Sequence, residues 1–208
     1  MTPNRKHVTG FFLFSILIVM SCLFSAARSD ELPANQFVEQ FSVTVLEAIK
    51  ARKQELIDNP EQLNVLIDEM VMPNVDFRKM TQLVVGRSWR DATPEQREEI
   101  IRQFRVLLVK TYSGALSQLQ DQTIEVDRLR ARPEDTNVIV TSRVIQKSGP
   151  PIDLAYRVQK GEDGWKIYDL SVLGLWIVDS YKNQFQPLLN ASGVEGLISA
   201  LKTKNNPT

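Results

Sequence analysis

The spacing of apolar residues changes at about residue 122, from every third or fourth position to every second position. The first spacing is typical of amphipathic helices, and the second is typical of strands with one buried face. A run of helices followed by a run of strands favours helices packed on an antiparallel sheet. The sequence therefore predicts an α+β domain, in which helices cover one face of the sheet.

Four helical segments are expected before the change. The first runs from 34 to about 52 and carries one apolar stripe, made of Phe37, Phe41, Val45 and Ala48. The second begins at Asn59, with Pro60 at its first helical position and Gln62 completing the start signal, and it stops before Pro73.

The other two helices also begin at recognisable capping residues. Asp76 can cap a short third helix, which Gly86 ends in a left-handed conformation. Thr93, Pro94 and Gln96 open the longest helix.

After residue 122 the pattern predicts an antiparallel meander. The clearest strand is 152–159, and 165–172 follows it after a glycine-bounded turn. A strand around Val138–Val144 precedes them, and 123–130 is a weaker first strand. Gly174 is expected to end the last strand, followed by one helix before Pro187 and a short helix from Gly193 to Leu201.

The first 29 residues have the order of a secretory signal peptide. Arg5 and Lys6 precede an apolar run from 10 to 24 and then a set of small residues, with cleavage expected after Ala27 or Ser29. The run is shorter than the roughly 20 apolar residues that span a bilayer. A retained anchor and a lipoprotein modified at Cys22 are the alternatives. Residues 30–208 are then a single exported domain.

Removal of this leader would also remove His7 and Cys22, the sole histidine and cysteine of the chain. The remaining chain could form no Ser-His-Asp triad, no Cys-His pair and no zinc site with nitrogen or sulfur ligands. We therefore expect no catalytic residue, no metal and no cofactor. The leader holds three basic and no acidic residues, so the 25 basic and 25 acidic residues of the whole chain leave a mature charge of −3. This charge argues against a nucleic-acid partner.

Two groups of residues are candidates for chemistry outside a pocket. Asp169 lies in an apolar strand and could act as a general base with Tyr156 or Tyr168; the alternative is a carboxylate satisfied by backbone groups or an arginine. Trp89, with Arg87 and Arg90 beside it, could meet a phosphate or a protein partner. The alternative is a solvated loop with a docked indole.

A pocket is expected where the third and fourth helices face the central strands, because the two periodicities must meet there. The candidate lipid-binding residues are Met80, Val84, Phe104, Leu108, Tyr112, Leu154, Tyr156 and Ile167. Residues that line a cavity and residues that fill a solid core look identical in sequence, and for any single one of them the sequence alone favours a solid core.

Two sets of motifs resemble a known family. They are Asp76-Phe77, Met80, Val85–Arg90, Ala92–Gln96, Phe104 and Tyr112, and then Gly164–Asp169, Gly174, Tyr181, Gln184-Phe185 and Gly193–Leu201. In these residues the chain is similar to the MlaC-like proteins, also called toluene-tolerance proteins. They are the periplasmic phospholipid carriers of the Mla pathway of outer-membrane lipid asymmetry.

The resemblance implies a cone-like fold similar to nuclear-transport-factor-like folds, with a curved antiparallel sheet and an apolar cavity for acyl chains. It also implies shuttling of phospholipid between the outer and inner membranes. The implied partners are an inner-membrane ABC transporter complex with an MCE protein and an outer-membrane lipoprotein-porin complex. The sequence departs from the family at Gly174-Leu175-Trp176, where Gly-Val-Ser is usual. A hopanoid-type carrier, a cone-fold enzyme using Asp169 and a tyrosine, and an adaptor with a filled core are the remaining alternatives.

Overall fold

The computed structural model describes residues 32–59, 61–132 and 134–206. The predicted signal peptide, which contains His7 and Cys22, lies outside the described residues. The alternatives of a retained anchor and of a lipoprotein concern the same segment.

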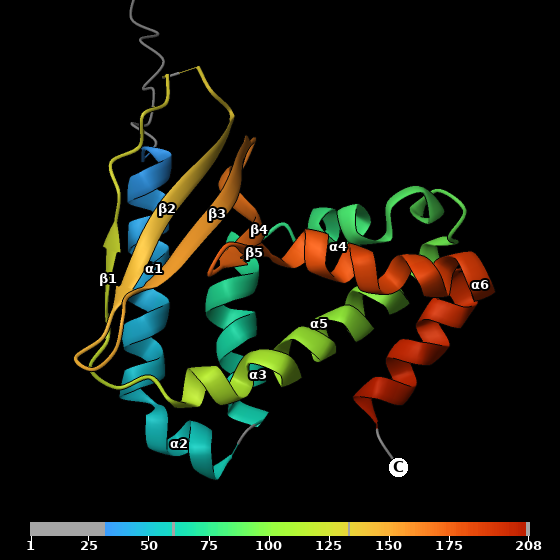
Figure 1. The fold of residues 1–208 in the computed structure, drawn as a ribbon, viewed down its shortest axis with the longest axis horizontal. Coiled ribbons are helices and arrows are strands. Elements are labelled where there is room, and N and C mark those ends of the chain that lie inside the picture. Colours follow the sequence, from blue (N-terminus) through green and yellow to red (C-terminus); the bar gives the residue numbers. More distant parts are fainter. Residues whose placement is uncertain (1–31, 60, 133, 207–208) are drawn as a thin grey trace, which may run out of the picture. The chain divides into compact units, whose positions relative to one another are not determined.

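Helices precede the sheet in the described chain, as the change of period predicts (Figure 1). The helical elements before the sheet are α1 (Ala34–Ala51), α2 (Lys53–Asp58), α3 (Glu61–Leu66), the π-helical turn η1 (Ile67–Val71), the 3-10 turn η2 (Met72–Asn74), α4 (Phe77–Val85), the 3-10 turn η3 (Gly86–Trp89) and α5 (Pro94–Ser117). The strands are β1 (Thr123–Val126), β2 (Asn137–Ile145), β3 (Ile152–Gly161), β4 (Gly164–Val172) and β5 (Leu175–Trp176), and α6 (Ile177–Asn205) follows them.

The strands form one sheet in chain order, and each pairs antiparallel with the next. Val140 lies opposite Tyr156 on β2 and β3, and Tyr156 lies opposite Leu170 on β4. A register shift between Arg157 and Val158 interrupts the β3–β4 pairing. The predicted meander and the α+β class are therefore confirmed.

The capping residues act as their sequence positions predict. The Asp76 carboxylate accepts a hydrogen bond from the Lys79 backbone N–H at 2.9 Å, and Gly86 follows α4 with φ 66°. Thr93 and Gln96 exchange both bonds of a capping box at the start of α5. These bonds satisfy backbone donors that a helix leaves without partners in its first turn.

The C-terminal element α6 consists of two helices that meet at Gly193, where the second helix was predicted to begin, but the first helix continues past Pro187 instead of ending before it. Pro187 lies inside α6, and the interruption falls at Gly193, with φ 63° and ψ −164°. A proline inside a helix loses its own N–H bond and crowds the carbonyl four residues earlier, but buried Phe185 and Leu189 on either side of Pro187 hold the helix in place. Gly193 adopts a conformation that is essentially restricted to glycine.

Two strand boundaries also differ from the prediction. β1 ends at Val126 instead of Arg130, because the ladder with β2 continues only to the bond from Asp127 N–H to the Thr141 carbonyl at 2.9 Å. Gly174 does not end the sheet. It turns the chain so that Leu175 and Trp176 pair back onto β4.

The described chain has two hydrophobic cores. The helical core lies among α4, η3, α5 and α6, and the sheet core lies between α1 and the sheet. Val75 and Leu170 pack against both cores. The connection is reinforced by the Asp76 N–H, which donates to the Ile167 carbonyl of β4 at 2.8 Å.

Candidate functional site

Helix α1 and the turns η1 and η2 border an open cavity of about 370 Å³. Its lining residues are Phe37, Gln40, Phe41, Thr44, Val45, Glu69, Met70 and Asn74. The apolar members include the rings of Phe37 and Phe41, whose centroids are 6.4 Å apart in a stacked arrangement. The polar members come from both α1 and the turns, so the lining is half apolar and half polar.

Two adjacent stripes of α1 explain why this helix can serve both the sheet and the cavity. Ala34 and Val38 are buried in the sheet core, whereas Phe37, Phe41 and Val45 line the cavity and are only half-buried. Residues four apart lie on the same face of a helix. One face of α1 therefore closes the sheet core, and the next face borders open space.

The opposite wall of the cavity is a π-helical turn. η1 is a π-helical turn between α3 and η2, and it contributes Glu69 and Met70 to the lining. The Asn74 side chain donates to the Met70 carbonyl at 2.9 Å, which joins the two turns. π-turns within helices frequently occur at functional sites.

Arg52 links the end of α1 to this wall. Its guanidinium donates to Glu55 at 3.0 Å and to Gln62 at 3.3 Å, and it lies 3.9 Å from the Glu69 carboxylate. The hydrogen bond with Glu55 raises the pKa of Arg52. Arg52 therefore connects α1, α2, α3 and η1 at one end of the cavity.

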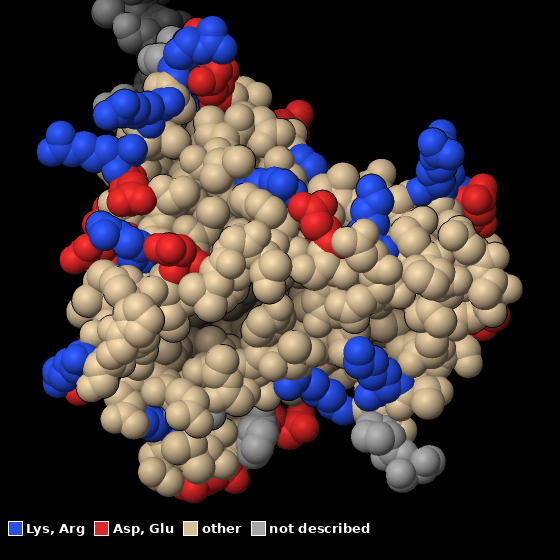
Figure 2. Space-filling model, in the orientation of Figure 1, with Lys and Arg blue, Asp and Glu red and all other residues tan. Residues whose placement is uncertain are grey.

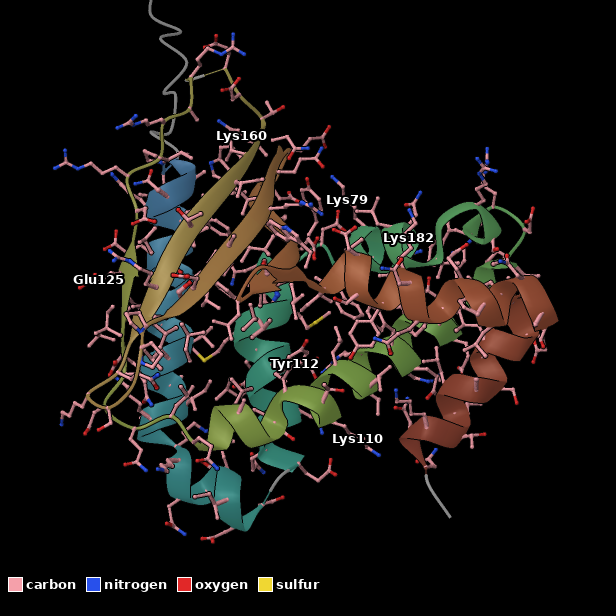
Figure 3. The ribbon with its side chains drawn as sticks, viewed as in Figure 1. Lys79, Lys110, Tyr112, Glu125, Lys160 and Lys182 are labelled. Atoms are coloured by element: carbon pink, nitrogen blue, oxygen red, sulfur yellow. The ribbon has the colours of Figure 1, made fainter. Side chains whose placement is uncertain are left out.

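Figure 2 shows that one face of the molecule is hollowed between the sheet and α5, and that few charged side chains border the hollow. Tyr112 lies at this hollow in the same view (Figure 3). It is 36% exposed, and burial together with the nearby Tyr181 raises the pKa of its hydroxyl.

The eight candidate residues do not lie together in one place. Met80, Val84 and Phe104 are buried in the helical core, and Leu108 packs against it. Tyr156 and Ile167 are buried in the sheet core, and Leu154 packs against that one. None of the eight is among the residues lining the described cavity. Their contact with a lipid stays a prediction.

The cavity residues from α1 were recognised from the sequence as an apolar stripe but not as part of a site. The apolar surface of α1 is wide enough for two stripes, with Ala34 and Val38 in one and Phe37 and Phe41 in the other. That width is the signal in the sequence that could have indicated a second apolar contact beside the sheet core. Met70 gave no such signal, since the π-helical turn that positions it has no sequence marker that we can identify.

Asp169 is fully buried and all its close contacts are donors. Its carboxylate accepts from Arg157 at 2.8 Å, from the Leu170 N–H at 2.9 Å and from the Val178 N–H at 3.0 Å. Burial raises the pKa of Asp169, and the Val178 N–H and Arg157 oppose that increase. The carboxylate is therefore a structural acceptor that holds the start of α6 against β3 and β4.

The two tyrosines considered as partners of Asp169 bond elsewhere. The Tyr156 hydroxyl accepts from the Ser42 hydroxyl at 3.2 Å, beneath α1. The Tyr168 hydroxyl donates to the Asn137 side-chain carbonyl at 2.9 Å. No catalytic pair with Asp169 forms among these described residues.

Trp89 is docked rather than presented to a partner. Its indole is buried, and the Arg97 guanidinium lies 5.6 Å from the ring centroid and donates to the Trp89 carbonyl at 3.0 Å. Arg87 and Arg90 remain exposed on either side. The docked-indole alternative is therefore the one observed.

Within the described residues there is no group of three or more His, Cys, Asp or Glu side chains that could hold a metal ion. No helix in the same part of the chain combines the length and the apolar character needed to cross a membrane.

A helix-covered antiparallel sheet with an open, half-apolar cavity is consistent with a ligand-binding protein. The family model described as "MlaC protein" matches residues 39–203, which is most of the chain. The chain therefore belongs to the MlaC family.

Two relatives are similar over most of their length. The intermembrane phospholipid transport system binding protein MlaC of Haemophilus influenzae is 23% identical over 194 residues, which is 91% of each chain. The toluene tolerance protein ttg2D of Pseudomonas putida is 23% identical over 178 residues, covering 85% of this chain and 82% of that protein.

A solved structure is more similar in sequence. The phospholipid-binding protein from Ralstonia solanacearum, in complex with a phospholipid, is 38% identical and has a TM-score of 0.80. The match covers 84% of this chain and 97% of that one. The family expected from the motifs is confirmed.

Proposed function

We propose that this protein binds a phospholipid and carries it through the periplasm between the outer and inner membranes, maintaining the lipid asymmetry of the outer membrane. The observation that carries the proposal is the 38% identity, over 97% of its chain, to a protein solved with a bound phospholipid. The cavity under α1 supports it, because Phe37, Phe41 and Val45 offer an apolar surface with space in front of it.

A carrier is physically necessary for such a ligand. Two acyl chains of about 30 methylenes in total would cost roughly 25 kcal/mol to expose to water, at about 0.8 kcal/mol for each. A free lipid monomer is therefore too rare to cross an aqueous space. The protein needs only to match the membrane in free energy, and no catalytic group is required.

The proposed contacts extend from the cavity in two directions. Beneath α1, Leu154, Tyr156 and Ile167 share the sheet core with Phe37 and Phe41. On the other side, Leu108 and Tyr112 lie on α5. Met80, Val84 and Phe104 form the packed helical layer behind Leu108, and we propose that they support this wall.

The proposal includes export and two protein partners. Removal of residues 1–29 would deliver the chain to the periplasm. There it would exchange lipid with an inner-membrane ABC transporter complex that contains an MCE protein, and with an outer-membrane lipoprotein-porin complex. The relatives are named as transport and tolerance proteins rather than enzymes. The Asp169 carboxylate accepts hydrogen bonds from Arg157 and from the Val178 N–H, so it is not free to act as the general base that the enzyme alternative requires.

The test is native mass spectrometry of protein released from its own periplasm by osmotic shock, without detergent. We expect a mature chain that begins between residues 28 and 30 and carries one diacyl phospholipid. A bound hopanoid would replace the ligand in the proposal, and protein that never carries lipid would reject it. N-terminal sequencing that finds Met1, or a diacylated Cys22, would reject the export step.

A further inference from the structure

The turn between β4 and β5 exposes two leucines. Leu173 is 65% exposed and Leu175 is 71% exposed, which are the highest values among the large apolar residues of the described chain. Gly174 lies between them, and a side chain added there would meet nothing within 4 Å. No charged residue occurs from Leu170 to Trp176. We call Leu173, Gly174 and Leu175 the apolar tip.

The backbone of the apolar tip is strained at a leucine. Leu173 has φ 52°, and it is the single non-glycine residue with positive φ in the described part of the chain. Glycine and asparagine adopt this conformation far more readily than leucine. Leu173 gains no burial in exchange for the strain, and such strain tends to persist at functional sites.

The apolar tip is held rigidly from behind. The Leu173 N–H donates to the Asp153 carbonyl at 2.9 Å, and Leu175 pairs with Val172. Next to the tip, the Trp176 ring lies 4.0 Å below the Arg157 guanidinium. Arg157 is in turn fixed by buried Asp169 at 2.8 Å. The two leucines are therefore presented on a fixed support, which lowers the entropy cost of docking.

The charges beside the apolar tip favour a protein partner over an anionic bilayer. Asp153 is exposed, and its carboxylate has no hydrogen bond or ion pair with any described residue. Asp179 is 59% exposed at the start of α6, 3.7 Å from Arg157. The exposed cation Lys182 lies further along α6 (Figure 3). Cations also lie beside both carboxylates, because Arg143 is opposite Asp153 on β2 and Arg157 is near Asp179. Charges of mixed sign give an anionic bilayer little to attract, whereas they match a protein pocket whose rim carries both signs.

We propose that the apolar tip is a docking element, which inserts Leu173 and Leu175 into an apolar pocket on a protein partner, with charges of both signs around its rim. The inference rests on the proposed function, because a carrier must meet the proteins that load and unload it. The chain has Leu175 and Trp176 where the family usually has valine and serine. The proposal explains both residues, because Leu175 would contact the partner and Trp176 packs under Arg157 to support the tip.

The test uses the variants Leu173→Asn and Leu175→Thr, with Ile57→Thr as the matched control. Ile57 is 50% exposed on α2, a helix that lies apart from β5 (Figure 1). The probes are the periplasmic domain of the MCE protein and the purified lipoprotein-porin complex. We expect each tip variant to weaken binding to at least one probe about tenfold, as removal of an interface anchor does. The control should bind both probes like the wild type.

Leu173→Asn also separates docking from folding. Asparagine tolerates positive φ, so its melting temperature should equal or exceed that of the wild type while its binding falls. Wild-type affinity of both tip variants for both probes would overturn the proposal. So would loss of sedimentation with phosphatidylethanolamine-phosphatidylglycerol vesicles while both probe affinities stay unchanged, because the tip would then bind a bilayer.

Lipid content distinguishes this inference from the proposed function. Each tip variant should carry as much phospholipid as the wild type, measured by native mass spectrometry. A wild type without lipid would reject the carrier function and leave the binding results interpretable. Normal lipid content with unchanged binding would reject the apolar tip alone.

Discussion

The helical core and the sheet side of this protein use similar apolar residues with different results. In the helical core, the ring of Phe104 has no exposed surface, and its centroid lies 5.6 Å from Phe77 and 5.0 Å from Tyr181. On the sheet side, Phe37 and Phe41 are only half-buried and border a cavity of about 370 Å³. The first region is filled by its own side chains, and the second leaves volume for another molecule.

The largest expected effect is truncation in the filled region. Phe104→Ala should lower the free energy of unfolding by about 3 to 5 kcal/mol, because it removes a buried ring from three aromatic neighbours. Phe41→Ala, its counterpart at the cavity, should cost less than half as much in the lipid-free protein. Urea denaturation of both delipidated variants checks this, and equal losses would remove the distinction between the two regions.

Enlargement should have opposite effects in the two regions. Leu107→Trp should overpack the helical core, where Leu107 is buried, and destabilise it by about 1 to 3 kcal/mol. Val45→Trp adds an indole to existing space, so the lipid-free protein should keep its melting temperature while phospholipid bound per mole falls. If Val45→Trp unfolds several degrees earlier and still carries lipid normally, the cavity is not where lipid binds.

The smallest effect concerns Asp169, which joins the two regions. Asp169→Asn should cost about 1 kcal/mol near neutral pH, because an amide oxygen in place of Oδ1 still accepts both N–H bonds and only the bond from Arg157 to Oδ2 is lost. Lipid binding should stay within a few-fold. A loss of enzymatic turnover with binding and stability intact would instead restore the enzyme alternative.

The pH dependence of the same variant sharpens the test. Burial raises the pKa of Asp169, so the folded state holds the proton more tightly than the unfolded chain does. The stability from this carboxyl is therefore fully present below its ordinary pKa of 3.8 and is lost as pH rises through its folded pKa. The stability difference between wild type and Asp169→Asn should shrink as pH rises over this window. A difference that grows with pH would mean that Arg157 and the N–H donors outweigh burial.

Sequence reasoning succeeded where one local rule decides the structure. The capping bonds of Asp76 and Thr93 and the alternation of β3 depend on neighbouring residues, and all three were confirmed. It failed where tertiary packing decides. Pro187 stays helical because Phe185 and Leu189 are buried on either side of it, and no local pattern reports that burial.

The site was predicted less well than the fold for a related reason. A stripe of apolar residues says that a face avoids water, but it does not say whether protein atoms or a ligand cover that face. Phe104 and Phe41 have the same sequence signature, and only the elements packed opposite them distinguish the two. The π-helical turn at Met70 could not be anticipated, because it depends on the contacts of Asn74 and Arg52.

The helix after Gly193 is the last part of the helical core to be synthesised. Its residues include Leu197, Ile198 and Leu201, which are buried in the helical core. The residues that line the cavity all precede Val75, and the sheet core behind them is complete once Leu170 has been synthesised. During synthesis from the N-terminus, the ligand-holding side is thus complete about thirty residues before the filled side, which must wait for the last turns of the chain.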